Sequence, residues 1–155
     1  MTIPEKLLTL LEKEKLCFLS TSHQDRPHIS LMNFTYLREK ELIILTSRAD
    51  TTKMSYIHHN PYVALLFTHL SGDNRPPVSC TVYGKARVAE PQQDHFYRQA
   101  HLQRHPGMEP FITGERIAVI TVQIQRATIT TIQDQVSNWS AEHASDVQTV
   151  NVNEG

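Results

Sequence analysis

The stretch Leu42–Phe67 reads LIILTSRADTTKMSYIHHNPYVALLF and combines three signals in a fixed order. A short apolar run at 42–46 is typical of a buried β-strand. The polar segment 47–53 opens a short helix, which is expected to end before Asn60-Pro61. A second apolar run at 62–67 has the composition of another strand. The order strand, polar turn, helix and strand therefore defines the centre of the predicted fold.

The start of this helix is a candidate binding site for a phosphate group, and a phosphate suggests a nucleotide-like ligand. Unpaired backbone N–H groups, the positive end of the helix dipole and the ammonium of Lys53 all favour an anion. Asp50 would compete for the same N–H groups if it caps the helix, and Arg48 could offset its charge. The alternative is an ordinary exposed lysine on a surface helix. The hydroxyl-bearing residues beside Lys53 are Thr46, Ser47, Thr51 and Thr52.

Upstream of this stretch, the pattern predicts one helix and two strands. Apolar residues at helical spacing indicate a helix over 3–14, ahead of strands over 16–22 and 28–37. A turn at 23–27 separates the two strands, and a charged hairpin tip at 38–41 precedes the next one. Three strands joined by two tight turns predict an antiparallel meander.

Downstream, strands again dominate. A polar loop at 69–77 leads into a long strand over 78–89, and Gly84 inside that strand indicates a bulge or a close backbone approach. Ser79 lies on the polar face of this strand, which we expect to meet either solvent or another subunit. The last expected elements are a polar helix over 92–104 and strands over 117–124 and 127–132.

About seven short strands with little room for helical crossovers predict a mainly β fold, an antiparallel barrel of Greek-key type with a few helices. The strand count favours a closed barrel over a sandwich. This pattern excludes a Rossmann site, and the chain has no glycine-rich fingerprint. We expect a single domain over 1–139 and a polar, mobile C-terminal tail over 140–155.

Composition narrows the functional classes. The chain has 155 residues and a formal net charge of −1, which gives no electrostatic case for nucleic acid or an anionic membrane. Apolar residues make up 39%, and so small a core favours an oligomer. Cys17 and Cys80 both fall in predicted strands and are expected to be buried free thiols, which suits a reducing cytosol. With no signal peptide and no apolar run long enough to span a bilayer, we expect a cytoplasmic protein.

Several other residues have both a functional and a structural interpretation. The strand containing Ser30 and Asn33 could hold a planar heterocycle along its edge, or it could be an ordinary core strand. His101 and His105 have the i, i+4 spacing of a zinc pair, but no third ligand lies near them in sequence, so we expect no metal. Trp139 could stack against a ligand, although a hydrophobic contact that ties the C-terminus to the barrel is favoured.

Taken together, these motifs resemble the flavin-binding split-barrel family typified by pyridoxamine 5′-phosphate oxidase. The similarity covers residues 5–135 in the order found in that family. The matching segments are FLSTS at 18–22, PHISLMN at 27–33, LTS at 45–47 with TK at 52–53, NPYVAL at 60–65 and VYGKARV at 82–88. The resemblance implies an FMN-binding split barrel.

It also implies a homodimer with FMN at the subunit interface and a small molecule as substrate. In the family, the strand matching 28–33 lies along the flavin ring, the segment at 45–53 holds the phosphate, and the position of Ser79 reaches over from the other subunit. The cofactor-binding residues that the resemblance and the phosphate motif imply are His28, Ser30, Leu31, Met32, Asn33, Leu45, Thr46, Ser47, Thr51, Thr52, Lys53 and Ser79.

Two departures refine the expected activity. The family has an arginine and a lysine where this chain has His28 and Asn33, which removes fixed charge from the cofactor site. The C-terminal Arg-x-His motif of true pyridoxamine 5′-phosphate oxidases is absent, so that activity is not expected. We therefore expect an FMN-dependent oxidoreductase in which no residue stands out as catalytic acid or base. The alternatives are a deazaflavin-dependent reductase, a non-catalytic flavin- or haem-binding protein and a barrel without cofactor.

Overall fold

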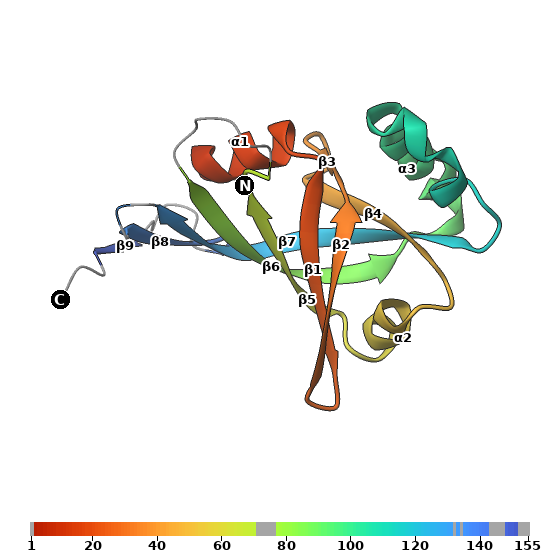
Figure 1. Ribbon diagram of the computed structural model, residues 1–155, viewed down its shortest axis with the longest axis horizontal. Coiled ribbons are helices and arrows are strands. Elements are labelled where there is room, and N and C mark those ends of the chain that lie inside the picture. The colour runs from red at the N-terminus through yellow and green to blue at the C-terminus, as the bar shows by residue number, and fades with distance from the viewer. Residues whose placement is uncertain (1, 71–76, 132, 134, 143–147, 152–155) are drawn as a thin grey trace.

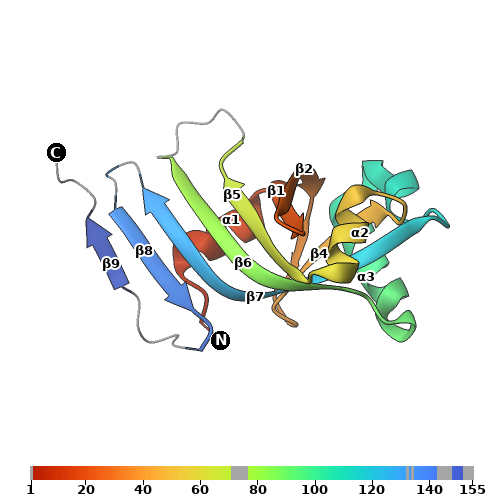
Figure 2. The ribbon, with the colours of Figure 1, turned by 90° about the horizontal axis from the view of Figure 1, so that it is seen from below.

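The computed structural model describes residues 2–70, 77–131, 133, 135–142 and 148–151. The described elements form one curled antiparallel sheet with helices on its outside (Figures 1 and 2). In chain order they are α1 (Glu5–Lys13), β1 (Leu16–His23), β2 (Arg26–Asn33), β3 (Thr35–Leu37), β4 (Leu42–Arg48), α2 (Thr52–His59), β5 (Tyr62–Thr68), β6 (Val78–Val88), α3 (Pro91–Arg104), the 3₁₀ helix η1 (Pro106–Phe111), β7 (Ile117–Thr131), β8 (Gln135–Ser140) and β9 (Gln148–Asn151).

The strand order is β2-β1-β5-β6-β7-β4-β3, and β8 and β9 extend the sheet from β7. Within the described residues, no ladder joins β2 to β3 or β4, so the sheet is split there. Phe34 is the single residue between β2 and β3 in the chain. The two edges of the split are therefore connected by the backbone at Phe34 and not by strand hydrogen bonds. The mainly β split barrel expected from sequence is confirmed, but a fully hydrogen-bonded closed barrel is not found.

Both hairpins of the predicted meander, β1–β2 and β3–β4, are present. The single strand expected over 28–37 is wrong, because it is broken at Phe34 into β2 and β3. These two strands lie at opposite ends of the strand order, since β5 pairs with β1 and β7 pairs with β4. The strands expected over 117–124 and 127–132 are one strand, β7, as far as Thr131; residue 132 lies outside the described residues. Gln125 and Arg126, which lie between the two expected strands, are exposed positions along β7.

Gly84 has the close backbone approach predicted for it, and it lies opposite a bulge. Tyr83 pairs with Arg126 and Gly84 with Ile124, so the extra residue of the bulge is Gln125 on β7. A Cβ at Gly84 would lie 2.6 Å from the backbone oxygen of Gln123 and 2.7 Å from Cγ1 of Val122. Only a residue without a side chain lets the two strands approach this closely.

The main core fills the barrel, and α1 covers it at one end (Figure 1). Leu7, Leu10 and Leu11 of α1 recur at helical spacing and are fully buried in this core. Phe34 and Phe67 meet edge to face at a centroid distance of 4.8 Å beside them. The apolar stripe predicted for the first helix therefore packs onto the barrel.

A smaller apolar cluster attaches α3 to the outer face of the sheet. Tyr97 of α3 packs there against Ile44 of β4 and Val119 of β7. Arg98 reinforces the contact, because its guanidinium donates to the carbonyl oxygens of Ile112 and Ile117 at 2.6 Å each. This helix and the η1 segment after it are therefore held over β4 and β7.

The structure also describes the two cysteines, Trp139 and part of the C-terminal segment. Cys17 and Cys80 are buried and free, as predicted, and burial raises the pKa of each thiol to about 12. Trp139 is 2% exposed and belongs to the main core, so it makes the hydrophobic contact with the barrel that the sequence favoured. Gln148–Asn151, in the segment expected to be a mobile tail, forms β9 against β8. None of the described helices is both long and apolar enough to cross a membrane.

Candidate functional site

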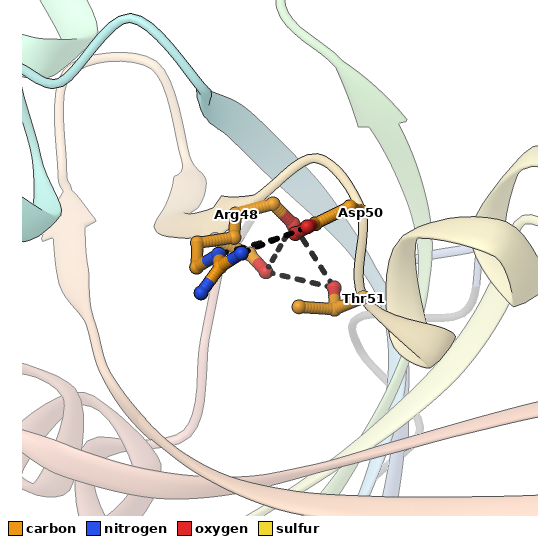
Figure 3. Close-up of polar contacts among 4 residues, drawn as sticks. Arg48, Asp50 and Thr51 are labelled. Carbon is orange, nitrogen blue, oxygen red and sulfur yellow. Dashed lines mark hydrogen bonds and ion pairs between the residues drawn. The ribbon is translucent and has the colours of Figure 1, made fainter.

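The turn between β4 and α2 is held by hydroxyl groups. Thr51, the residue before the first helical turn, has φ −90° and ψ 160°. Its hydroxyl donates to the carbonyl of Arg48 at 3.0 Å and lies 3.1 Å from the hydroxyl of Ser47 (Figure 3). Ser47 and Thr51 therefore hold the turn in shape, and their hydroxyls already have partners within the protein.

Asp50 does not cap the helix. Its carboxylate pairs instead with the guanidinium of Arg48, at 2.8 and 3.1 Å, and Arg48 also holds the pKa of that carboxyl below its usual range (Figure 3). No side-chain cap bond is made at the start of α2, from Thr51 or from any other described residue. The competition between Asp50 and a bound phosphate is therefore absent, and the first-turn N–H groups have no side-chain acceptor.

Lys53 is a half-buried cation in the first turn of α2. Burial lowers the pKa of its ammonium. Among the described residues, no acceptor lies within hydrogen-bond or ion-pair distance of it. Thr52 beside it is exposed and its hydroxyl is likewise unpaired within that part of the chain. A desolvated cation next to free helix N–H groups is a favourable position for an anion.

Strand β2 presents two different faces. Ile29 and Leu31 point outward and are 67% and 56% exposed, whereas His28 and Ser30 point inward with Met32. Nδ1 of His28 and the hydroxyl of Ser30 are buried and have no hydrogen-bond partner in the structure. Buried polar atoms without a partner are rare, and they indicate room for a hydrogen-bonding ligand or water.

The end of β2 and the middle of β4 meet at one cavity. A space of about 130 Å³ is bounded by Asn33 and Thr46 from these strands. The hydroxyl of Thr46 donates to the carbonyl of Phe111 in η1 at 3.0 Å. The residues that line the cavity are Leu31, Met32, Asn33, Thr46, His101, Met108, Phe111 and Ile112. Two segments that the sequence offered as separate candidates are therefore adjacent.

Of the twelve expected site residues, four line this cavity and eight do not. The eight are His28, Ser30, Leu45, Ser47, Thr51, Thr52, Lys53 and Ser79. Leu45 is fully buried and its side chain belongs to the barrel core, so only its backbone can face a ligand. Ser79 lies on β6 opposite Thr68 and Thr130, and no described cavity joins it to Lys53 within this chain. Its predicted contact from a second subunit stays a prediction.

His101 of α3 also lines this cavity, which its place in the sequence did not indicate. Its Nδ1 lies 2.7 Å from the Thr35 hydroxyl, and Nε2–H of His105 donates to the carbonyl of Phe34 at 2.7 Å. The two rings are 4.7 Å apart. Burial lowers the pKa of His101 to about 3, and burial also lowers that of His105, helped by the charges of Arg104 and Lys15.

The i, i+4 spacing therefore places His101 and His105 side by side against the junction of β2 and β3. No group of three or more His, Cys, Asp or Glu side chains in the described part of the chain could hold a metal ion.

We expect the pKa of His101 to make folding sensitive to acid. The unfolded chain takes up this proton near pH 6.5 and the folded chain only near pH 3, so stability is lost as the pH falls through that window. Between pH 7 and 5 this group should lower the free energy of unfolding by about 2 kcal/mol. Urea denaturation of the wild type and His101→Gln at both pH values measures it. An equal pH dependence in both proteins would contradict the assignment.

A family model described as pyridoxamine 5′-phosphate oxidase matches residues 3–134 of the chain. The chain belongs to the pyridoxamine 5′-phosphate oxidase-like family. Relatives with matching lengths exist in two yeasts. A pyridoxamine 5′-phosphate oxidase homologue of Schizosaccharomyces pombe is 26% identical, with 89% of this chain and 90% of the relative covered. A second homologue, of Saccharomyces cerevisiae, is 24% identical, with 83% and 90% covered.

Solved structures share the fold of this family member. A haem-binding protein from Mycobacterium smegmatis superposes with a TM-score of 0.78 at 17% identity, covering 94% of this chain and 62% of that one. An FAD-binding protein from Mesorhizobium loti superposes with a TM-score of 0.66 at 16% identity, covering 83% and 94%. At these identities the likeness concerns the split-barrel fold alone.

Proposed function

We propose that the protein is a flavin-dependent oxidoreductase that binds FMN, with the phosphate of FMN held at the start of α2. The observation that carries the proposal is Lys53, a half-buried ammonium without a partner among the described residues. Asp50, the nearest carboxylate in sequence, is already paired with Arg48. Thr52 and the first-turn N–H groups would complete the phosphate contacts.

The residues of β2 fit a polar heterocycle. Nδ1 of His28 and the hydroxyl of Ser30 are buried without partners on one face of β2, and Asn33, which follows on the other face, lines the cavity shared with β4. An isoalloxazine ring has carbonyl and N–H groups that such side chains and the strand backbone can bind. Neither His28 nor Asn33 brings the fixed charge that the family's arginine and lysine would supply. FMN would therefore be held chiefly through its phosphate.

Bound flavin would supply hydride and electron transfer, and the protein would bind and orient it and exclude water. His101 fits a positioning role as a neutral ring at the cavity, since its pKa lies far below neutrality. The Mesorhizobium loti protein of similar fold is named as an FAD-binding protein, which supports this class of cofactor. A small-molecule substrate is part of the proposal.

The proposal includes a homodimer with the cofactor at its interface. Ile29, Leu31 and Phe111 are 67%, 56% and 60% exposed, and Leu31 and Phe111 both border the cavity beside β2. Exposed apolar side chains grouped beside a site are typical of an interaction surface. A second subunit would cover them and could bring its Ser79 to the cofactor.

Replacing Lys53 with alanine is the test. Loss of a charge-assisted phosphate contact should remove about 1.5–3 kcal/mol of binding, a weakening of FMN affinity of roughly 10- to 100-fold. Quenching of FMN fluorescence on titration measures it. Lys6→Ala, which removes an exposed lysine on α1, is the matched control and should bind FMN like the wild type. Unchanged affinity in Lys53→Ala would refute the phosphate assignment.

A second candidate function is haem binding without turnover, which the Mycobacterium smegmatis relative, named as a haem-binding protein, favours. The absorbance spectrum of the protein after incubation with FMN, a deazaflavin or haem separates the three cofactors. Reduction of the bound flavin by NAD(P)H and its reoxidation by an acceptor separate an enzyme from a carrier.

A further inference from the structure

A second cavity, of about 300 Å³, lies between the start of α3 and the outer face of the sheet. Lys85 and Arg87 of β6 line it, together with Thr121 and Gln123, their pairing partners on β7. It shares no lining residue with the cavity beside β2. The site proposed for FMN therefore does not account for it.

The charges on this cavity are unbalanced. Lys85 and Arg87 are two residues apart on one strand, so both side chains project from the same face. Neither forms an ion pair with any described residue. Glu90 is the acidic residue of the lining and is likewise not within ion-pair distance of a described cation. Because the other side chains of the lining are neutral, the cavity has a net charge of +1.

The wall contributed by α3 combines an apolar ring with an oriented amide. Tyr97 is 3% exposed, and its hydroxyl donates to Oε1 of Gln93 at 2.7 Å. Since the oxygen of Gln93 is engaged, its NH₂ group is left as the free donor. Leu42 and Ala89 add further apolar surface. The positive end of the 14-residue helix α3 faces the same region.

We propose that this cavity binds a small phosphate monoester with a short apolar body, at a site independent of Lys53. The guanidinium of Arg87 suits paired hydrogen bonds to phosphate oxygens, and Lys85 adds a second positive charge. The apolar body packs against Leu42 and Ala89, the partly exposed apolar residues of the lining. Lys85 and Arg87 are both exposed to solvent, and the concave shape and partly apolar lining distinguish the site from a flat surface pair of cations.

Amide chemical shifts of the full chain, saturated with FMN and titrated with phenyl phosphate, test the proposal. We expect saturable shifts at Lys85, Arg87 and Gln93 in the wild type and equally in Lys53→Ala. The double variant Lys85→Gln/Arg87→Gln should weaken binding at least tenfold. Lys6→Gln/Lys13→Gln removes the same charge elsewhere on the exposed surface and should leave binding unchanged.

One further variant and two further titrations test the charge of the site and the apolar and phosphate parts of the proposed ligand separately. Glu90→Gln should tighten binding, because it removes the one negative charge of the lining. Phenol and inorganic phosphate should each bind at least tenfold more weakly than phenyl phosphate. The proposal is overturned if no saturable shift occurs, if the shift survives Lys85→Gln/Arg87→Gln, or if Lys53→Ala abolishes it. Equal binding of phenol or of inorganic phosphate would overturn it as well.

Discussion

Replacing Phe34 with alanine is expected to lower the free energy of unfolding by about 3–5 kcal/mol. Phe34 is fully buried and packs edge to face on Phe67. Its backbone N–H donates to the carbonyl of Lys15 at 3.0 Å, and its own carbonyl accepts from His105. Truncation would leave a cavity where the split sheet depends on packing rather than on strand hydrogen bonds. Urea denaturation at pH 7 measures the change.

Phe96→Ala serves as the control for the same chemical change at the surface. Phe96 is 53% exposed on α3, so its removal should alter stability by about 0.5 kcal/mol or less. If Phe34→Ala and Phe96→Ala lost equal stability, Phe34 would not be the packing centre that we describe.

Gly84→Val should cost about 3 kcal/mol of stability. A side chain at this position would meet the backbone oxygen of Gln123 at 2.6 Å, and a backbone atom cannot move aside without disturbing the β6–β7 ladder. Thermal or urea denaturation measures the loss. Binding at the cavity beside Lys85 should weaken too, because that cavity lies directly after the bulge.

Gly107→Val is the matched control. No atom lies within 4 Å of a Cβ built at Gly107, and its backbone is not in the left-handed region. The substitution should therefore change stability by about 0.5 kcal/mol. A loss at Gly107 as large as that at Gly84 would show that valine is disfavoured for reasons other than the close strand approach.

The sequence predicted the local elements well because their signals are local. The apolar stripe of α1, the short helix before Asn60-Pro61 and the close strand approach at Gly84 are all present as expected. Each depends on residues within a few positions of one another, where periodicity and backbone preferences act directly.

The strand order could not be predicted in the same way. The pairing of β1 with β5 and of β4 with β7 joins segments far apart in the chain. Alternating apolar residues show which face of a strand is buried, but they do not show which other strand pairs with it. The expected break in β7 failed for a related reason, since exposed polar residues are ordinary on the outer face of a strand.

For the candidate site, the sequence predicted Lys53, Thr46 and the strand 28–33 but not their arrangement. Whether Asp50 would cap the helix depended on Arg48, whose guanidinium binds the Asp50 carboxylate. The cavity walls from α3 and η1 were missed because their contact with β2 exists only in three dimensions.

Comparing FMN with riboflavin tests the central claim most directly, because riboflavin has the same ring and no phosphate. If Lys53 binds the phosphate, Lys53→Ala should weaken FMN at least tenfold and leave riboflavin affinity within about twofold of the wild type. An equal loss for both ligands, or no loss for FMN, would contradict the placement of an anionic cofactor at the start of α2.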